Sequence, residues 1–228
     1  MTEMNVFTGL TASEMEYEAK VVYEAIASGD APGYTNRQWS ILLTQAQEKV
    51  VRQVILNGLD KDEHNRRVVS RLIRDYSTTD FKRYKWKNAF VVKLPQRYMY
   101  LLEDYVNDNI RVVPKSYDYV HANKDNPFEK PKKEEYFWRI VHKDGAIIVT
   151  DGSELKSYNL SYLVRPTPII TKILDPAKSI EGVYEQTNCK LDPIVHRDIV
   201  NMAGKLAELY ASNQLGYQLK TLEEHTLK

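Results

Sequence analysis

The first eighty residues place apolar side chains with the period of α-helices. Across residues 39–54 these side chains recur every three or four positions, as on a helix with one buried face. Thr11 is followed three positions later by Glu14, and Thr35 by Gln38, and both spacings are typical of a capping box at a helix start. The pattern predicts two helices, over residues 11–28 and 35–57.

A third helix is expected after the acidic-rich residues 60–63. Their carboxylates suit a helix start, and the apolar residues Val68, Leu72, Ile73 and Tyr76 then follow the same period. Because the loops between the three helices are short, we predict an antiparallel bundle.

After residue 80, β-branched and aromatic residues become frequent. Residues 89–94 and 110–113 each precede a proline and are predicted to be strands. Between them, Met99, Leu102 and Val106 have helical spacing, which predicts a short helix over residues 96–106.

Residues 135–165 carry the clearest strand pattern. Apolar and polar residues alternate in three runs, and the runs are separated by Asp144–Gly145 and Asp151–Gly152. Asp-Gly is a typical hairpin turn, because both central residues of a type I′ turn need a positive φ. We therefore predict a three-stranded antiparallel meander over residues 135–165.

The C-terminal region is predicted to return to helix. Asp192 and Pro193 combine an N-cap residue with proline at the first helical position, and apolar spacing continues to about Asn213, before a weakly patterned tail. The chain is thus expected to have an α+β fold, in which an N-terminal helical bundle and a C-terminal helix frame a central antiparallel β-rich insertion. The expected segments are residues 1–80, 81–175 and 176–228, with the helices of 1–80 and 190–213 packed as one domain.

The composition mainly excludes certain classes of protein and certain structural features. The 228 residues carry a net charge of +1, so no overall field draws the chain to nucleic acid or to an anionic membrane. A single cysteine, Cys189, excludes an internal disulfide, and the longest apolar runs are too short for a membrane span. We expect no membrane partner. Sixteen tyrosines favour surfaces that are hydrated in the monomer and buried in an assembly.

The motifs of common enzyme chemistry are not found in the sequence. The nine glycines form neither a dinucleotide-binding nor a P-loop pattern, and the five histidines lack the spacing of metal ligands. Ser153 lacks the flanking glycines of a nucleophile elbow, and Asp144 and Asp151, near His142, are explained by their turns. We therefore expect no catalytic residues, no metal, no cofactor and no enzymatic activity.

The main local charge feature is a basic segment over residues 61–93, with ten Lys or Arg residues against four Asp or Glu residues. Helical spacing would place Arg67, Arg71 and Arg74 on one helix face, and the following stretch interleaves cations with aromatic rings. Three interpretations stay open: a phosphate-binding patch, a contact with an acidic neighbour, and a solvated face. The candidate basic patch consists of Arg67, Arg71, Arg74, Lys82, Arg83, Lys85 and Lys87.

Three short motifs carry a resemblance to a known class of proteins. They are Asn-Pro-Phe-Glu-Lys-Pro at 126–131, Tyr-Phe-Trp-Arg-Ile at 136–140 and the proline-rich stretch 162–170. With them, residues 81–210 resemble virion proteins of crAss-like tailed bacteriophages, in particular those stacked as rings below the portal. The helical ends with a β-rich insertion are also similar in layout to head-to-tail adaptors of short-tailed phages.

The resemblance implies a homo-oligomeric ring, commonly of twelve copies, in the neck of a virion that assembles in the host cytoplasm. Its implied partners are other copies of the chain, the portal protein and adjacent neck or tail ring proteins, and DNA passes through the lumen without sequence-specific contact. No catalytic positions are carried over from this family.

The candidate contact residues are the apolar and aromatic side chains of the motifs and of the tail. Prolines stiffen the turn at 126–131, which either presents Phe128 to a neighbour or covers the meander as an ordinary loop. The tail is either an arm that orders on assembly or a frayed terminus. The candidate interface residues are Pro127, Phe128, Trp138, Tyr158, Tyr162, Leu215, Tyr217 and Leu219.

The sequence is compatible with two functions. The first is a structural ring protein in the head-to-tail connector, and the alternative is a DNA-binding or packaging-associated module that uses residues 61–93. A channel in which DNA slides should not hold phosphate tightly, so in the first case most of the basic segment is expected to face a neighbouring protein or solvent.

Overall fold

The computed structural model describes residues 9–27, 33–59, 62–107, 109–132, 135–143 and 145–226, with side chains as far as Ser212. The chain divides into two compact units, Met1–Leu72 with Pro166–Lys228, and Ile73–Arg165. The first unit holds all the long helices and the second all the strands of the sheet, so the fold is α+β, as predicted.

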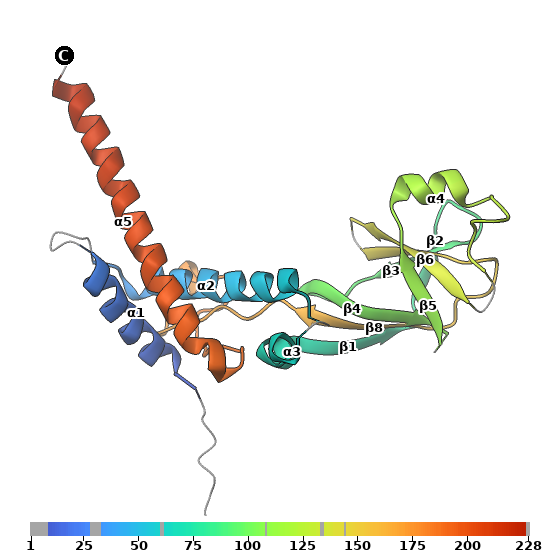
Figure 1. The fold of residues 1–228 in the computed structure, drawn as a ribbon, viewed down its shortest axis with the longest axis horizontal. Coiled ribbons are helices and arrows are strands. Elements are labelled where there is room, and N and C mark those ends of the chain that lie inside the picture. Colours follow the sequence, from blue (N-terminus) through green and yellow to red (C-terminus); the bar gives the residue numbers. More distant parts are fainter. Residues whose placement is uncertain are drawn as a thin grey trace, which may run out of the picture. The chain divides into compact units, whose positions relative to one another are not determined.

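The first unit is built around α1 (Ala12–Ile26), α2 (Asn36–Asn57) and α5 (His196–Thr226), with the short helix α3 (Glu63–Val69) (Figure 1). Both predicted capping boxes are present, with Thr11 and Glu14 at the start of α1 and Thr35 and Gln38 at the start of α2. Both α1 and α2 pack against α5. A short 3₁₀ turn, η3 (Pro193–Val195), leads into α5.

Two helix ends differ from the prediction. The third helix stops at Val69 and is followed by the 3₁₀ turn η1 (Ser70–Leu72) and the strand β1 (Ile73–Thr78). Helical spacing alone could not show that Ile73 and Tyr76 pair with strand residues near position 160. At the other end of the chain, the backbone of α5 stays helical to Thr226 instead of ending near Asn213.

A buried polar row on α2 holds the loop that returns from the second unit. Ser40, Thr44 and Gln47 lie one helical turn apart and are almost fully buried. The hydroxyls of Ser40 and Thr44 accept hydrogen bonds from the backbone N–H groups of Thr171 and Ile169, at 3.1 and 3.0 Å. The Gln47 amide donates to the Thr167 carbonyl at 2.9 Å. These bonds satisfy the backbone groups that face α2, while Ile170, between Ile169 and Thr171, pairs with Thr187 in an isolated antiparallel bridge.

The second unit is a single eight-stranded sheet in the order β1-β8-β4-β5-β6-β7-β3-β2. All neighbouring strands are antiparallel except β5 and β6, which are parallel, and α4 (Tyr117–Asn123) connects these two. The remaining strands are β2 (Phe81–Arg83), β3 (Ala89–Lys93), β4 (Tyr98–Val106), β5 (Ile110–Pro114), β6 (Tyr136–His142), β7 (Gly145–Val149) and β8 (Tyr158–Val164).

The predicted three-stranded meander is correct only for its first hairpin. Strands β6 and β7 pair as expected, but β8 lies between β1 and β4 instead of beside β7. Gly145 lies within β7 without a positive φ, and Asp144 is outside the described residues. A Cβ atom on Gly145 would lie 2.0 Å from the Val92 carbonyl oxygen, so glycine is required here by the close approach of β3.

The predicted helix over residues 96–106 is wrong, because this segment forms the strand β4. It pairs with β8, and the pairing shifts between Tyr98 and Tyr100 and again between Leu101 and Glu103. Each shift breaks the two-residue alternation of a regular strand. The apolar residues of β4 therefore recur with a spacing that imitates a helix.

Candidate interaction surfaces

The turn at Asn126–Pro131 presents Phe128 to solvent. The Asn126 side-chain oxygen accepts a hydrogen bond from the Phe128 N–H at 3.1 Å, and the Asn126 carbonyl accepts one from the Lys130 N–H at 2.9 Å. Pro127 is also exposed, and the Phe128 ring is 87% exposed. Phe128 therefore does not cover the sheet, and it is available to a partner.

A second set of contacts ties this turn to α4. The Tyr119 hydroxyl donates to the Glu129 carboxylate at 2.5 Å, and this hydrogen bond raises the pKa of Tyr119. The Tyr119 ring packs edge-on against Trp138 at 5.7 Å, while the Lys115 ammonium lies 4.2 Å from the centre of the same ring. The turn is thus hydrogen-bonded to Tyr119, whose ring packs against the buried Trp138.

Three further aromatic candidates lie inside the second unit. Trp138, Tyr158 and Tyr162 are all buried, and they stabilise the sheet instead of presenting a surface. The Tyr158 hydroxyl donates to Asp104 at 2.9 Å, and Asp104 also pairs with Arg139 at 2.8 Å. Burial raises the pKa of Asp104, and the Arg139 guanidinium opposes that rise.

The basic segment does not form the predicted single helix face. Arg67 lies on α3, Arg71 on η1 and Arg74 on β1, so helical spacing does not apply across them. The Arg67 guanidinium lies 3.6 Å from the Asp192 carboxylate, which joins α3 to the start of η3. Arg74 donates to the backbone carbonyl of Ile73.

The second half of the basic segment forms a surface of cations and aromatic rings. Lys82, Arg83, Lys85 and Lys87 are exposed on β2 and on the loop that follows it. The Lys85 ammonium lies 5.6 Å from the Tyr84 ring and 5.9 Å from the Tyr117 ring on α4, and a hydrogen bond to Tyr117 raises the pKa of Lys85. Trp86 packs on Tyr117 at 5.2 Å.

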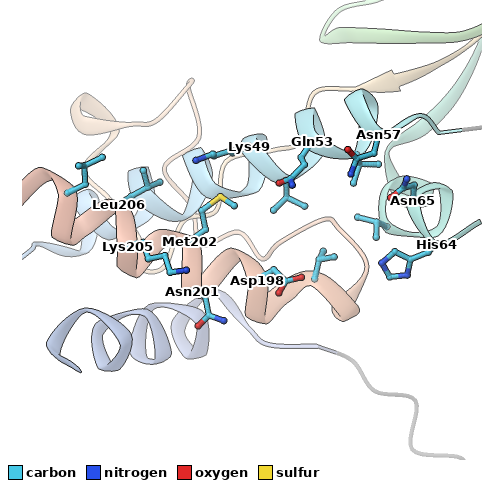
Figure 2. Close-up of a pocket in the computed structure, with 15 residues that line it drawn as sticks. Lys49, Gln53, Asn57, His64, Asn65, Asp198, Asn201, Met202, Lys205 and Leu206 are labelled. Carbon is cyan, nitrogen blue, oxygen red and sulfur yellow. The ribbon is translucent and has the colours of Figure 1, made fainter. Parts of the chain in front are cut away.

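The first unit contains a groove that was not predicted from the sequence. It has a volume of about 690 Å³ and lies between α2, α3 and α5 (Figure 2). Val50, Val54 and Val68 are buried beneath it, and Met202 and Leu206 point into it from α5. Polar side chains follow both rims, with Lys49, Gln53 and Asn57 on α2 and Asp198, Asn201 and Lys205 on α5. The helical spacing of these two polar rows was the signal available in the sequence.

The tail candidates Leu215, Tyr217 and Leu219 belong to the helical backbone of α5, and their side chains are outside the described part of the chain. Their contact role stays a prediction.

Among the described residues, no group of His, Cys, Asp and Glu side chains is arranged to hold a metal ion, and no helix has the length and apolarity needed to cross a membrane. Cys189 is buried, which raises the pKa of its thiol to about 11, and its Sγ donates to the Gln47 side-chain oxygen at 3.2 Å. A thiol with a raised pKa is a poor nucleophile at neutral pH.

Comparison with known proteins identifies the family. The model of the phage tail ring protein 3/4 family matches residues 10–218, which cover the second unit and most of the first. The chain is 29% identical to ring protein 4/5 of Bacteroides phage crAss001 over 239 residues, with 91% of this chain and 98% of the relative covered. It is also 29% identical to ring protein 3 of the same phage over 189 residues, with 74% and 82% covered. The chain therefore belongs to the phage tail ring protein 3/4 family and is a structural ring protein of a crAss-like phage virion.

Proposed function

We propose that the chain forms a homo-oligomeric ring in the head-to-tail connector, where it joins the portal to tail proteins and lets DNA pass through. The observation that carries this proposal is the family match, which spans both structural units. Assembly takes place in the host cytoplasm, and the ring has twelve copies, as the resemblance to head-to-tail adaptors implies. The role is structural, without an enzymatic step.

A ring in a stack needs contacts to its own copies and contacts to the layers above and below. The two relatives from phage crAss001 carry the names of different ring proteins, and this chain is similar to both. That similarity supports stacked rings built from related chains.

The exposed turn at Asn126–Pro131 is the proposed contact with the next layer. A large ring on a stiff turn loses little conformational entropy on binding, and aromatic side chains often dominate binding energy. Phe128 meets both conditions, because the Asn126 cap and the Glu129–Tyr119 bond fix its backbone. Its partner is the portal or an adjacent ring protein.

The basic segment is proposed to face a neighbouring protein or solvent. Its cations are divided between the two units, and Arg67 already pairs with a carboxylate of its own unit. The exposed group on β2 and its loop, Lys82, Arg83, Lys85 and Lys87, is the part that suits an acidic neighbour.

The experiment is to mix purified full-length chain with portal protein and to examine the particles by sedimentation and electron microscopy. We expect a complex in which a ring of this chain sits on the portal. Failure of the chain to join the portal would contradict the connector role.

A parallel measurement separates the DNA-binding alternative. Fluorescence anisotropy with a short DNA duplex is recorded at low and moderate salt for the wild type and for a Lys82→Ala, Arg83→Ala, Lys85→Ala, Lys87→Ala variant. A DNA-binding module would bind at low salt, lose affinity steeply as salt rises, and lose it in the variant. We expect no appreciable binding by either protein.

A further inference from the structure

We infer that the C-terminal end of α5 docks into the α2–α3–α5 groove of a neighbouring copy and so closes the ring. This contact depends on the ring proposed above and gives it a specific side-to-side interface. The groove and the end of α5 are the two partners, and both belong to the same chain.

The groove has the form of a receptor for an amphipathic helix. Its floor is apolar, with Val50, Val54 and Met202 among its residues, and a row of polar side chains from each of α2 and α5 borders it (Figure 2). A helix with one apolar face lies in such a groove with its polar flanks against the rims.

The end of α5 has the matching sequence pattern. Leu215, Leu219 and Leu222 are spaced i, i+4, i+7, so on the helical backbone that continues to Thr226 they share one side. At a rise of about 1.5 Å per residue this row extends over roughly 10 Å, and the rim from Lys49 to Asn57 over roughly 12 Å. The donor row and the groove therefore have similar lengths.

The donor must be a different copy of the chain. One wall of the groove is formed by α5 itself, through residues from Asp198 to Leu209, and the same helix continues without a break to Thr226. Figure 1 shows this helix running on past α1 and α2. A continuous helix cannot fold back onto its own earlier turns, so its end reaches only the groove of another molecule. Such a contact joins two different surfaces, and this is the type of interface that closes a ring by rotation.

The charges of the two partners are complementary. The rims of the groove carry Lys49 and Lys205 against Asp198, a net of one positive charge. Residues 214–226 carry Lys220 against two glutamates, Glu223 and Glu224, a net of one negative charge. The pairing of a positive rim with a negative helix favours this occupant over a basic partner.

Cysteine cross-linking tests the contact in the full-length chain. Gln53 is the middle of its polar row and Leu219 the middle of the leucine row, so the two lie close for either direction of the docked helix. One preparation carries Gln53→Cys and another carries Leu219→Cys, and the two are mixed with a short bis-maleimide. The single native cysteine is buried, and wild-type protein controls for its reaction.

The expected result is a covalent dimer in the mixture, weak or no dimer from either variant alone, and a ladder of higher species from the double variant. Rings seen by electron microscopy without the mixed dimer would overturn this contact and leave the proposed ring intact. If neither rings nor mixed dimers form, with and without portal protein present, both the ring and this contact are contradicted.

Truncation of the leucine row gives a second, independent test. Leu219→Ala should raise the concentration needed for half-assembly by about tenfold, because burial of a leucine side chain contributes at least about 1.4 kcal/mol, which is a factor of ten. Thr221→Ala, off the leucine row in the same helix, is the matched control and should leave that concentration unchanged. Equal effects of the two substitutions would overturn the contact.

Discussion

The Tyr119 hydroxyl donates a hydrogen bond to the Glu129 carboxylate across ten residues of sequence, and this bond joins α4 to the turn that presents Phe128. Tyr119→Phe removes the bond and keeps the ring contact with Trp138. We expect the free energy of unfolding to fall by about 1 kcal/mol or less, because the bond is exposed. Binding to the neighbouring protein should weaken, since the turn is then less well fixed. Chemical denaturation and a pull-down with portal protein measure the two effects, and unchanged binding would show that the bond does not prepare the turn.

Phe128→Ala should separate binding from folding. The ring is 87% exposed, so its removal should change the free energy of unfolding by less than about 0.5 kcal/mol. Val141→Ala is the matched control, because Val141 is also in the second unit and is 77% exposed. We expect Phe128→Ala to reduce binding to the portal or to an adjacent ring protein by at least about tenfold, and the control to bind normally. Equal affinities of the two variants for every neck protein would argue against a contact role for Phe128.

Gly204 allows α1 and α5 to pack closely. A Cβ atom at this position would lie 2.6 Å from the Cγ1 atom and 2.9 Å from the Cβ atom of Val22. Gly204→Ala should therefore lower the free energy of unfolding by about 1–3 kcal/mol, although alanine favours helix. Adding Val22→Ala should recover part of the loss, as measured by urea denaturation. A Gly204→Ala protein as stable as the wild type would mean that the two helices separate at little cost.

His196 is expected to make the stability of the first unit depend on pH. Its Nδ1 atom accepts a hydrogen bond from the Leu10 N–H at 3.0 Å, so the folded protein needs the neutral ring, whose Nε2 faces the Leu191 carbonyl. Burial lowers the pKa of His196, and the nearby Arg71 lowers it further, while Leu191 and Asp192 oppose the change. The unfolded chain therefore takes up a proton before the folded one as pH falls below about 6.5.

The free energy of unfolding should accordingly decrease as pH falls from about 6.5 toward the lowered pKa of His196. One titrating group gives a slope of at most about 1.4 kcal/mol per pH unit. His196→Gln keeps one acceptor and one donor but does not titrate, so it should flatten this part of the profile. Thermal unfolding between pH 5 and 8 measures the difference. Parallel profiles of the two proteins would mean that His196 is not the titrating group.

Removal of one partner of the buried Asp104–Arg139 ion pair should lower the free energy of unfolding strongly. Both side chains are largely buried, and Arg139→Met would leave the Asp104 carboxylate with only the Tyr158 hydroxyl as a hydrogen-bond donor at that oxygen. We expect a loss of about 3–5 kcal/mol in the free energy of unfolding, and a smaller loss in the Arg139→Met, Asp104→Asn double variant. Urea denaturation of the three proteins gives both values. If the double variant were less stable than Arg139→Met, the loss of stability in the single variant could not arise from the unpaired Asp104 charge.

Local signals predicted the helices of the first unit well. Thr11 with Glu14 and Thr35 with Gln38 mark the helix starts where the structure has them, because a capping box is complete within four residues. The buried polar row on α2 was not predicted. Its partners lie more than 100 residues away in the chain, and nothing near Gln47 indicates Thr167 as its acceptor.

The sheet was predicted less well, for two physical reasons. The shifts in pairing within β4 give Met99, Leu102 and Val106 a helical spacing. Strand order is set by pairing between distant segments, so β8 could not be placed between β1 and β4 from the Asp-Gly turn before it. For Phe128 the sequence left an exposed ring and a ring that covers the sheet as alternatives, and the structure has the exposed one. The buried Trp138, Tyr158 and Tyr162 show that aromatic content alone does not separate core from surface.

Single-particle electron microscopy of the purified full-length chain, with and without portal protein, is the decisive measurement for the proposed ring. We predict closed rings of one copy number, twelve, which sit coaxially on the portal when it is present. A chain that stays monomeric under both conditions, at concentrations where the portal itself is assembled, would contradict it.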